Sequence, residues 1–302
     1  MIEAAAAGQQ IQEAFHAAGV DGFLHAVDVD RGTELGHQSD ELVVLASVFK
    51  VPLLVEFERQ VAEGRIDERE RARVPAGFRV PGPTGISAML DDVELSWRDL
   101  AQLMIAVSDN TATDFLAERI GLDDVARTLR GLGLEQTVID ADCRAILRTF
   151  QEDLGLSWPP VPGDMERVEA AGAAAMTSNR SLRPETAVRS TAREIARLFT
   201  LIWRDEAGPA EACAEMRRIL LSQVWRDRLR SGFGGAERIG GKTGTLWGIR
   251  NEAGVVEVPG RGRVAVAVFT RSFEPRWNDP AADHVIGTAA RIAVDALLEA
   301  AA

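Results

Sequence analysis

Residues 42–57 read LVVLASVFKVPLLVEF, an apolar stretch interrupted in its middle by Ser47 and Lys50. A helix that is hydrophobic on nearly all sides belongs in the interior of a domain. Glu56 and the polar residues that follow it restore a side that can face solvent. We therefore predict a central buried helix that begins at Ser47. Its first turn is expected to be irregular, because Pro52 cannot donate a main-chain hydrogen bond.

Ser47 and Lys50 are three residues apart, a spacing that places two side chains on one face of a helix. A serine hydroxyl is a poor nucleophile until a base takes its proton. A lysine can be that base when burial disfavours its charged form. Alone, however, the pattern is more typical of an N-cap serine followed by a lysine that reaches the surface. The interpretation therefore depends on the rest of the chain.

The composition restricts the class of protein. A chain of 302 residues with 46% hydrophobic and 26% charged residues is typical of one large soluble domain or two joined lobes. The formal charge of −12 argues against nucleic-acid and membrane partners. The N-terminal residues 1–19 lack the features of a signal peptide, and no apolar stretch is long enough to span a membrane. We therefore expect a cytoplasmic protein, and we leave its oligomeric state open.

Cysteine and histidine are too few and too scattered to form a recognisable metal site. The residues concerned are Cys143, Cys213, His16, His25, His37 and His284. None of their spacings matches a metal or redox motif, and no histidine lies in a candidate catalytic stretch. We predict no metal, no cofactor and no Ser-His-Asp triad.

Periodicity indicates strands near both ends of the chain and helices between them. The expected strands are 23–30, 33–38, 236–243, 249–258 and 263–271, and the expected helices are 3–18, 96–107, 111–121, 123–132, 191–202, 209–221 and 281–299. Residues 138–189 show no sustained period, so we predict an irregular segment or lid there.

This order of elements predicts an α+β fold in which both ends of the chain contribute to one antiparallel sheet flanked by the terminal helices. We expect an α/β lobe from residues 1–40 and 205–302 and a helical lobe from residues 41–204. The active site is expected between the two lobes. Trp247 and the loop 81–86 are candidates for its walls, although both fit ordinary packing as well.

Three short polar motifs occur at predicted ends of elements: Ser47-Val48-Phe49-Lys50, Ser108-Asp109-Asn110 and Lys242-Thr243-Gly244. Each motif is weak by itself. In this order and context the set resembles the serine β-lactamase and penicillin-binding protein superfamily, class A in particular. The resemblance covers nearly the whole chain and implies a β-lactamase/transpeptidase-like fold.

The resemblance also implies catalytic roles for four residues. Ser47 would be the acylated nucleophile and Lys50 its proton acceptor. Ser108 would relay a proton to the leaving group, and Lys242 would hold that hydroxyl together with a substrate carboxylate.

Further residues would bind the substrate. Asn110 would orient Lys50 and a substrate amide, and Thr243, within the motif that ends at Gly244, would donate a hydrogen bond to the carboxylate. The main-chain N–H groups of Ser47 and Thr245 would form the oxyanion hole. Arg250 would assist in binding the carboxylate, as an arginine does in several class A relatives.

One feature of class A β-lactamases is missing. These enzymes carry a Glu-x-x-Leu-Asn motif whose glutamate activates the deacylating water. The corresponding stretch, about 36 residues after Ser108, contains Asp142-Cys143-Arg144-Ala145 and no such motif. The nearby carboxylates are Asp140, Asp142, Glu152 and Asp153, and nothing in the sequence selects one of them. Because a displacement of about 1 Å can cost on the order of 100-fold in rate, we expect inefficient β-lactam turnover.

The resulting prediction is a serine hydrolase that forms an acyl-enzyme on Ser47 with a lactam, amide or ester of a small, carboxylate-bearing molecule. Two alternatives stay open. One is an acyltransferase or biosynthetic enzyme on the same scaffold, and the other is a domain that binds or accepts an acyl group without turnover.

Overall fold

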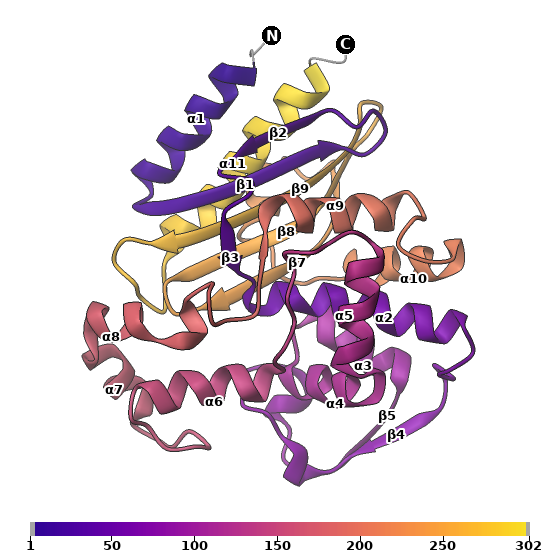
Figure 1. The fold of residues 1–302 in the computed structure, drawn as a ribbon, viewed down its shortest axis with the longest axis vertical. Helices are drawn as coiled ribbons and strands as arrows, with labels where there is room; N and C mark the ends of the chain where they lie inside the picture. Colours follow the sequence, from indigo (N-terminus) through magenta and orange to yellow (C-terminus); the bar gives the residue numbers. More distant parts are fainter. Residues whose placement is uncertain (1–3, 300–302) are drawn as a thin grey trace.

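The computed structural model describes residues 4–299 and is built around a five-stranded antiparallel sheet. The strands lie in the order β2-β1-β9-β8-β7 (Figure 1). Their bounds are Val20–Asp28 for β1, Glu34–His37 for β2, Arg238–Leu246 for β7, Ile249–Val258 for β8 and Gly262–Ser272 for β9. Both ends of the chain therefore contribute to one sheet, and β7 lies at its edge.

Successive side chains of each strand point to opposite faces of the sheet, as in any β-strand. In β9, Val264, Val266 and Val268 belong to the core under α1 (Ala4–Ala17) and α11 (Pro280–Glu299). The residues between them, ending at Phe269, belong to the core shared with α9 (Ala192–Trp203). Figure 1 shows the terminal helices on one side of the sheet and α9 on the other.

The remaining helices form a second body beside β7 (Figure 1). They are α2 (Lys50–Ala62), α3 (Trp97–Ala106), α4 (Asn110–Ile120), α5 (Leu122–Gly131), α6 (Cys143–Asp153), α7 (Asp164–Ala170), α8 (Gly172–Ser178) and α10 (Ala210–Leu220). The short 3-10 helices are η1 (Ala46–Phe49), η2 (Ala76–Phe78), η3 (Gly85–Ala88), η4 (Arg180–Leu182) and η5 (Leu229–Gly232). Two short antiparallel pairs join β3 (Leu42–Val44) to β6 (Arg189–Thr191) and β4 (Arg71–Val74) to β5 (Val93–Ser96).

The fold class, the central helix and most element positions were predicted correctly. The apolar side chains of α2 from Val51 to Phe57 are fully buried. Its expected irregular start is the 3-10 turn η1, after which the α-helix begins at Lys50. Ser96 caps α3 as expected by accepting a hydrogen bond from Asp99 N at 3.3 Å.

The prediction of an irregular segment over residues 138–189 was wrong, because α6, α7 and α8 lie within it. Hydrogen bonds from a residue distant in the chain stabilise the first turn of α6. Asp114 of α4 accepts hydrogen bonds from the main-chain N–H groups of Cys143 and Arg144, both at 2.8 Å. Asp142 caps the same helix by accepting from Ala145 N at 2.7 Å. A hydrophobic period computed along the chain does not reveal the contribution of Asp114.

The placement of the third motif at a strand end was also wrong. β7 continues to Leu246, so Lys242, Thr243 and Gly244 lie inside the strand. Another element can still pack against these residues, because an edge strand has one side without a partner strand.

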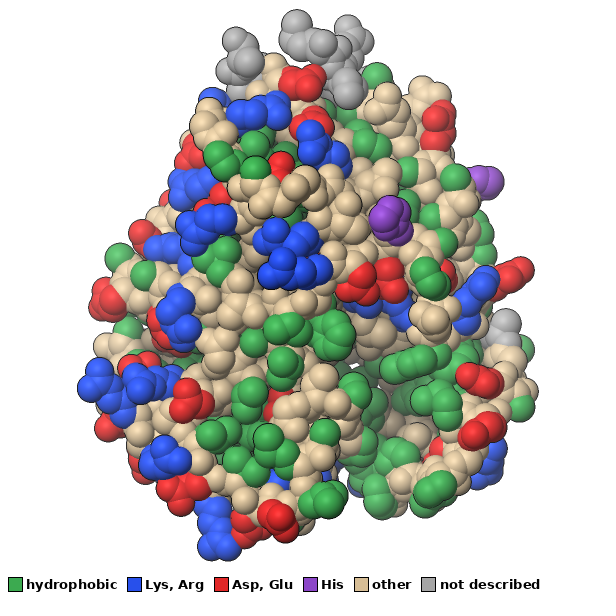
Figure 2. Space-filling model, turned by 180° about the vertical axis from the view of Figure 1, so that it is seen from behind, with side chains coloured by type: hydrophobic (Ala, Val, Ile, Leu, Met, Phe, Trp, Pro, Cys, Tyr) green, Lys and Arg blue, Asp and Glu red, His purple; other side chains and the backbone are tan. Residues whose placement is uncertain are grey.

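The surface of the described residues mixes charged groups of both signs. Figure 2 shows acidic and basic side chains interspersed over one face, with hydrophobic side chains around a hollow in its lower half. Between residues 4 and 299, no helix has the length and apolar character needed to cross a membrane.

Candidate active site

Ser47 lies in the tight turn between β3 and α2, half-exposed between buried neighbours. The residue before it, Ala46, has a φ of 46°, which a residue with a Cβ rarely adopts. Such a conformation persists only where surrounding contacts hold it. The turn is therefore a strained one, and its contacts identify which residues shape the site.

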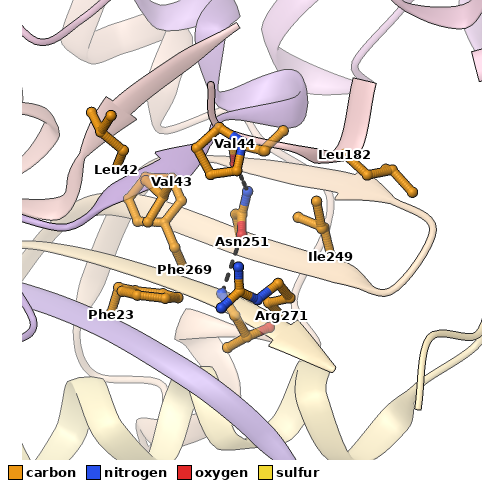
Figure 3. A pocket seen from close by; sticks show the side chains of 11 residues that line it. Phe23, Leu42, Val43, Val44, Leu182, Ile249, Asn251, Phe269 and Arg271 are labelled. Atoms are coloured by element: carbon orange, nitrogen blue, oxygen red, sulfur yellow. Dashed lines mark hydrogen bonds between the residues drawn. The ribbon is translucent and has the colours of Figure 1, made fainter. Parts of the chain in front are cut away.

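Asn251 of β8 holds the chain just before this turn. Its Nδ2 donates to the main-chain carbonyls of Val44 at 2.9 Å and Leu45 at 3.2 Å, and its Oδ1 accepts from Thr270 N at 3.3 Å (Figure 3). Asn251 also lines a separate pocket together with Phe23 and Val43 (Figure 3). The prediction from sequence missed Asn251, because no motif marks it.

Gly244 lets β7 come close to the nucleophile turn. A Cβ at this position would lie 2.6 Å from the carbonyl oxygen of Leu45. The absence of a side chain thus brings the edge strand against η1. β7, which continues through Thr245, therefore lies against η1, the 3-10 helix that contains Ser47. The oxyanion hole formed by the N–H groups of Ser47 and Thr245 stays a prediction.

Lys50 joins the first motif to the second. Its side chain is fully buried, and Nζ donates to Ser108 O at 2.9 Å, Ser108 Oγ at 3.2 Å and Asn110 Oδ1 at 2.8 Å. Ser108 has a φ of 60°, another strained conformation in the site. Within residues 4–299, no hydrogen bond links Lys50 to Ser47. The structure thus brings the predicted base into contact with Ser108 and Asn110, and its action on Ser47 stays a prediction.

Hydrogen bonds from an earlier loop of the chain hold the second motif in place. Asp109 caps α4 by accepting from Ala112 N at 3.1 Å and also accepts from Ser87 Oγ at 3.0 Å. Asn110 Nδ2 donates to Pro81 O at 2.8 Å. The loop 81–86 therefore borders the site through hydrogen bonds to the motif.

Lys242 is fully buried, and its Nζ donates to the carbonyl oxygen of Thr243 at 2.8 Å. Burial holds the pKa of Lys242 well below its usual value, and the positive charges of Lys50 and Arg228 lower the pKa further. Among the described residues it makes no hydrogen bond to Ser108, so the predicted contact with that hydroxyl is absent from this structure. The main-chain N–H of Thr243 donates to Gln223 Oε1 at 2.6 Å.

Arg250 is buried, and its guanidinium donates to Leu246 O and Ile249 O, both at 3.0 Å. Burial lowers its pKa, while Asp283, 3.4 Å away, opposes that shift. The structure therefore directs Arg250 to main-chain carbonyls. Its contact with a substrate carboxylate stays a prediction.

A second arginine, Arg228, lies closer to the third motif than Arg250 does. Its guanidinium donates to Gly244 O at 2.8 Å and to Thr245 Oγ1 at 2.7 Å, and it pairs with Asp283 at 2.6 Å. Two buried arginines thus share one carboxylate. The prediction from sequence did not include Arg228, because this residue lies in a loop with no motif of its own.

The carboxylates near the missing motif have different partners. Asp142 caps α6, Glu152 pairs with Arg148 at 2.7 Å, and Asp153 pairs with Arg180 at 2.7 Å. Asp140 is exposed and lines a cavity beside Ala46.

Arg144 lies 36 residues after Ser108, in the region where a class A enzyme carries its glutamate. Its side chain donates to Phe78 O at 2.8 Å. The prediction from sequence did not include Asp114, whose pKa is raised to about 6 by burial and by the nearby charge of Asp142. Counting from the second motif therefore leads to a basic residue, and the lack of a water-activating carboxylate stays a prediction.

Trp247 is buried and packs its ring on Trp277, with ring centroids 6.1 Å apart. It belongs to an apolar cluster with Val44 and Leu246. Both cysteines are free and buried, and residues 4–299 contain no group of three or more residues suited to a metal ion.

The chain is similar to known proteins over nearly its full length. The Beta-lactamase2 family, described as the beta-lactamase enzyme family, matches residues 6–297. The beta-lactamase regulatory protein BlaB of Streptomyces cacaoi is 29% identical, covering 96% of this chain and 97% of that protein. The beta-lactamase of Streptomyces albus G is 26% identical, covering 91% and 79%.

Solved structures agree with this assignment. The crystal structure of beta-lactamase from Sphaerobacter thermophilus DSM 20745 has a TM-score of 0.76 and 26% identity, covering 95% of this chain and 96% of that one. The structure of PBP-A has the same fold, with a TM-score of 0.77 at 23% identity and coverage of 97% and 96%. The chain therefore belongs to the beta-lactamase enzyme family and is a protein of the serine β-lactamase kind.

Proposed function

We propose that this protein is a serine hydrolase that forms an acyl-enzyme on Ser47 with a small lactam, amide or ester. The observation that carries the proposal is the buried side chain of Lys50, whose Nζ contacts both Ser108 and Asn110 beside the nucleophile turn. A surface lysine in an ordinary helix would have no reason to be buried against a second polar motif.

Acylation in this site would move one proton from Ser47 to the leaving group by way of Lys50 and Ser108. Ser47 Oγ attacks the substrate carbonyl, and Lys50 takes the hydroxyl proton. The N–H groups of Ser47 and Thr245 hold the oxyanion. Ser108 passes a proton to the departing nitrogen or oxygen and is reprotonated from Lys50. Water then attacks the carbonyl of the ester that joins the acyl group to Ser47. The acyl group leaves as a carboxylic acid, and Ser47 Oγ regains a proton.

The proposed substrate carries a carboxylate near the third motif. Lys242, Arg228 and Arg250 bring three basic groups to this region, and Asp283 pairs with both arginines. Thr243 and Thr245 offer hydroxyl groups beside them. An anionic group at this position would pair with these basic groups and would favour the charged form of Lys242.

A second candidate function is an acyl-accepting domain with slow or no turnover, such as a sensor. Arg144 occupies the region where a water-activating carboxylate was sought, and one relative is named a regulatory protein. The two candidates share acylation of Ser47 and differ only in the release of the acyl group.

Intact-mass spectrometry after mixing with a penicillin tests both candidates, with Ser47→Ala as the control. An adduct on the wild type that clears within the time course supports the hydrolase. An adduct that persists supports the acyl-accepting domain. A folded protein that forms no adduct with penicillins or with simple esters would contradict both.

A further inference from the structure

We infer that Gln223 limits the length of the substrate's leaving group, because it occupies the open edge of β7 at Thr243 and leaves Thr245 for the substrate. The substrate class that fits is a small molecule that ends beside Thr243. A peptide that continues along the strand does not fit. The inference rests on the acyl-enzyme at Ser47 and on the oxyanion position at Thr245 that are proposed above.

Thr243 and Thr245 both face the open edge of β7. The register of β7 with β8 sets Thr243 opposite Glu252 and Thr245 opposite Arg250. In an antiparallel pair, residues that exchange hydrogen bonds with the partner strand alternate with residues whose N–H and C=O point away from it. The main-chain N–H of Thr243 donates to Gln223, outside the sheet, so Thr243 points away from β8. Thr245, two residues further along, points the same way.

Both outward groups of Thr243 already have partners. Its N–H donates to Gln223 Oε1 at 2.6 Å, and its carbonyl oxygen accepts from Lys242 Nζ at 2.8 Å. Thr245 differs from it. Within residues 4–299, the main-chain N–H and C=O of Thr245 have no partner outside the sheet, and its hydroxyl accepts from Arg228. The main chain of a substrate can therefore pair with Thr245 but not with Thr243.

Glu252, a buried carboxylate of β8, determines which end of the Gln223 amide meets Thr243. Its Oε1 accepts from Gln223 Nε2 at 2.6 Å, and its Oε2 accepts from Leu229 N at 2.7 Å. An ionised carboxylate only accepts hydrogen bonds, so it holds the NH₂ group of Gln223 and leaves the amide oxygen for Thr243. Burial raises the pKa of Glu252 to about 7, against the opposing effects of the Leu229 N–H and the charge of Arg228.

The leaving group is the part of the substrate that would lie toward Thr243. Its proposed proton donor is Ser108, whose Oγ accepts from Lys50 Nζ at 3.2 Å. Burial, and next the charge of Lys50, lower the pKa of Lys242, so the two lysines lie near each other. Lys242 directly precedes Thr243 in β7. The groups that would protonate the leaving group therefore lie at this end of the edge.

The spacing of the strand sets the length limit. Outward residues of a strand are about 7 Å apart, which is the length of two residues of an extended chain. When the substrate carbonyl pairs with the N–H of Thr245, a leaving group of one residue ends short of Thr243. A leaving group of two residues reaches Thr243 and finds both of its main-chain groups occupied.

Two neutral thioesters of N-acetylglycine test this limit. One has thioglycolamide as its leaving group, and the other has thioglycolylglycinamide, which is one residue longer. Ser47 Oγ bonds to the carbonyl carbon, the C–S bond breaks, and the thiol leaves with the serine proton. Thiol release at pH 8, where Glu252 is ionised, gives kcat/KM. We expect the shorter thioester to react about tenfold faster, because the longer one leaves polar groups unpaired at an occupied edge.

Variants assign the effect to the two side chains. Gln223→Ala frees the N–H of Thr243 and should reduce the preference for the shorter thioester by about threefold or more. Gln12→Ala, at an exposed position of α1, is the control and should retain the preference. Glu252→Gln has one acceptor oxygen for two donors, so it should also reduce the preference.

Exchanging the two residues, Gln223→Glu together with Glu252→Gln, gives every group a partner again. The new carboxylate can accept from Thr243 N and from the new amide, whose oxygen can accept from Leu229 N. This double variant should regain the preference that each single change reduces. A role in folding alone would not produce such a recovery in the ratio of two substrates.

The outcomes separate this inference from the proposed function. Thiol release that needs Ser47 but is indifferent to the added residue, or a preference that survives in Gln223→Ala, overturns the inference alone. A folded double variant without the preference overturns the role of Glu252. Absence of Ser47-dependent thiol release and of an adduct with both thioesters, in a protein shown by circular dichroism to be folded, overturns the proposed function and this inference together.

Discussion

Asn251 and Val44 are 207 residues apart in the chain, yet Nδ2 of Asn251 donates a 2.9 Å hydrogen bond to the main-chain carbonyl of Val44. The same nitrogen donates to Leu45 at 3.2 Å. Both carbonyls lie just before Ala46, whose positive φ shapes the nucleophile turn. The central sheet thus holds the strained turn through one buried amide.

Asn251→Ala should therefore weaken both folding and acylation. Leu45 O keeps the N–H of Val48 as a donor at 3.1 Å, so the loss falls mainly on Val44 O. Leaving one buried carbonyl unpaired costs about 1–3 kcal/mol, and we expect a loss of unfolding free energy of that order. Denaturant unfolding and the rate of Ser47 acylation measure the two effects. Asn251→Asp should be no better than alanine, because a carboxylate would face two carbonyls. Rescue by aspartate would contradict this role.

Gly244→Ala should separate β7 from the nucleophile turn. The added Cβ would lie 2.6 Å from Leu45 O, so one of the two backbones must move. Because a 1 Å displacement can cost on the order of 100-fold, we expect at least that loss in the acylation rate. Gly234→Ala is the matched control, since its Cβ would meet nothing within 4 Å. Equal rates in the two variants would argue against a close-approach role.

Lys50→Met should slow acylation by about 10²- to 10⁴-fold, the usual contribution of a general base. Lys50→Arg keeps the positive charge but should not rescue the rate, because arginine does not release its proton in proteins. Intact-mass spectrometry at several times after mixing with an ester measures the acylation rates of both variants. A fully active arginine variant would show that the charge, and not proton transfer, is what the site needs.

Arg228→Gln should weaken the binding of substrates that carry a carboxylate. The change removes the guanidinium next to Thr245 Oγ1 and Gly244 O. We expect KM for a carboxylate-bearing substrate to rise about tenfold or more, since hydrogen bonds to charged groups are worth about 1.5–3 kcal/mol. An ester without a carboxylate should show a smaller change. Equal losses for both substrates would indicate a structural role only.

Glu58 on α2 should make the protein less stable as the pH rises. Burial, followed by the charges of Glu215 and Glu68, raises its pKa from 4.5 to about 8, and Oε1 has no hydrogen-bond partner in the described structure. Between these two values the folded state holds a proton that the unfolded state releases. Unfolding free energy should therefore fall as the pH rises from 4.5 to about 8.

Glu58→Gln removes this titration and should be more stable than the wild type at pH 8.5 by an amount on the order of a few kcal/mol. The two proteins should be nearly equal at pH 5. Glu118→Gln, at an exposed position of α4, is the control and should leave the pH dependence unchanged. A wild-type stability advantage at high pH would refute the assignment. Denaturant midpoints at both pH values measure the difference.

The sequence alone was sufficient for features that depend on local patterns. The apolar run after Ser47 predicted a buried helix, and the strand patterns near both ends of the chain predicted one antiparallel sheet flanked by the terminal helices. Ser96 and Thr191 marked the starts of α3 and α9 by their own capping hydrogen bonds. The three motifs were sufficient to name the family.

Tertiary structure alone determined the contacts between segments that are distant in the chain. The start of α6 depends on Asp114 of another helix, and the third motif lies against the turn of Ser47 because Gly244 has no side chain. Arg228 and Asn251 reached the site in the same way. A local pattern records what a residue does to its neighbours in sequence. A buried hydrogen bond or a close approach exists only once folding has brought the two backbones together, and the packing of the whole chain sets that distance.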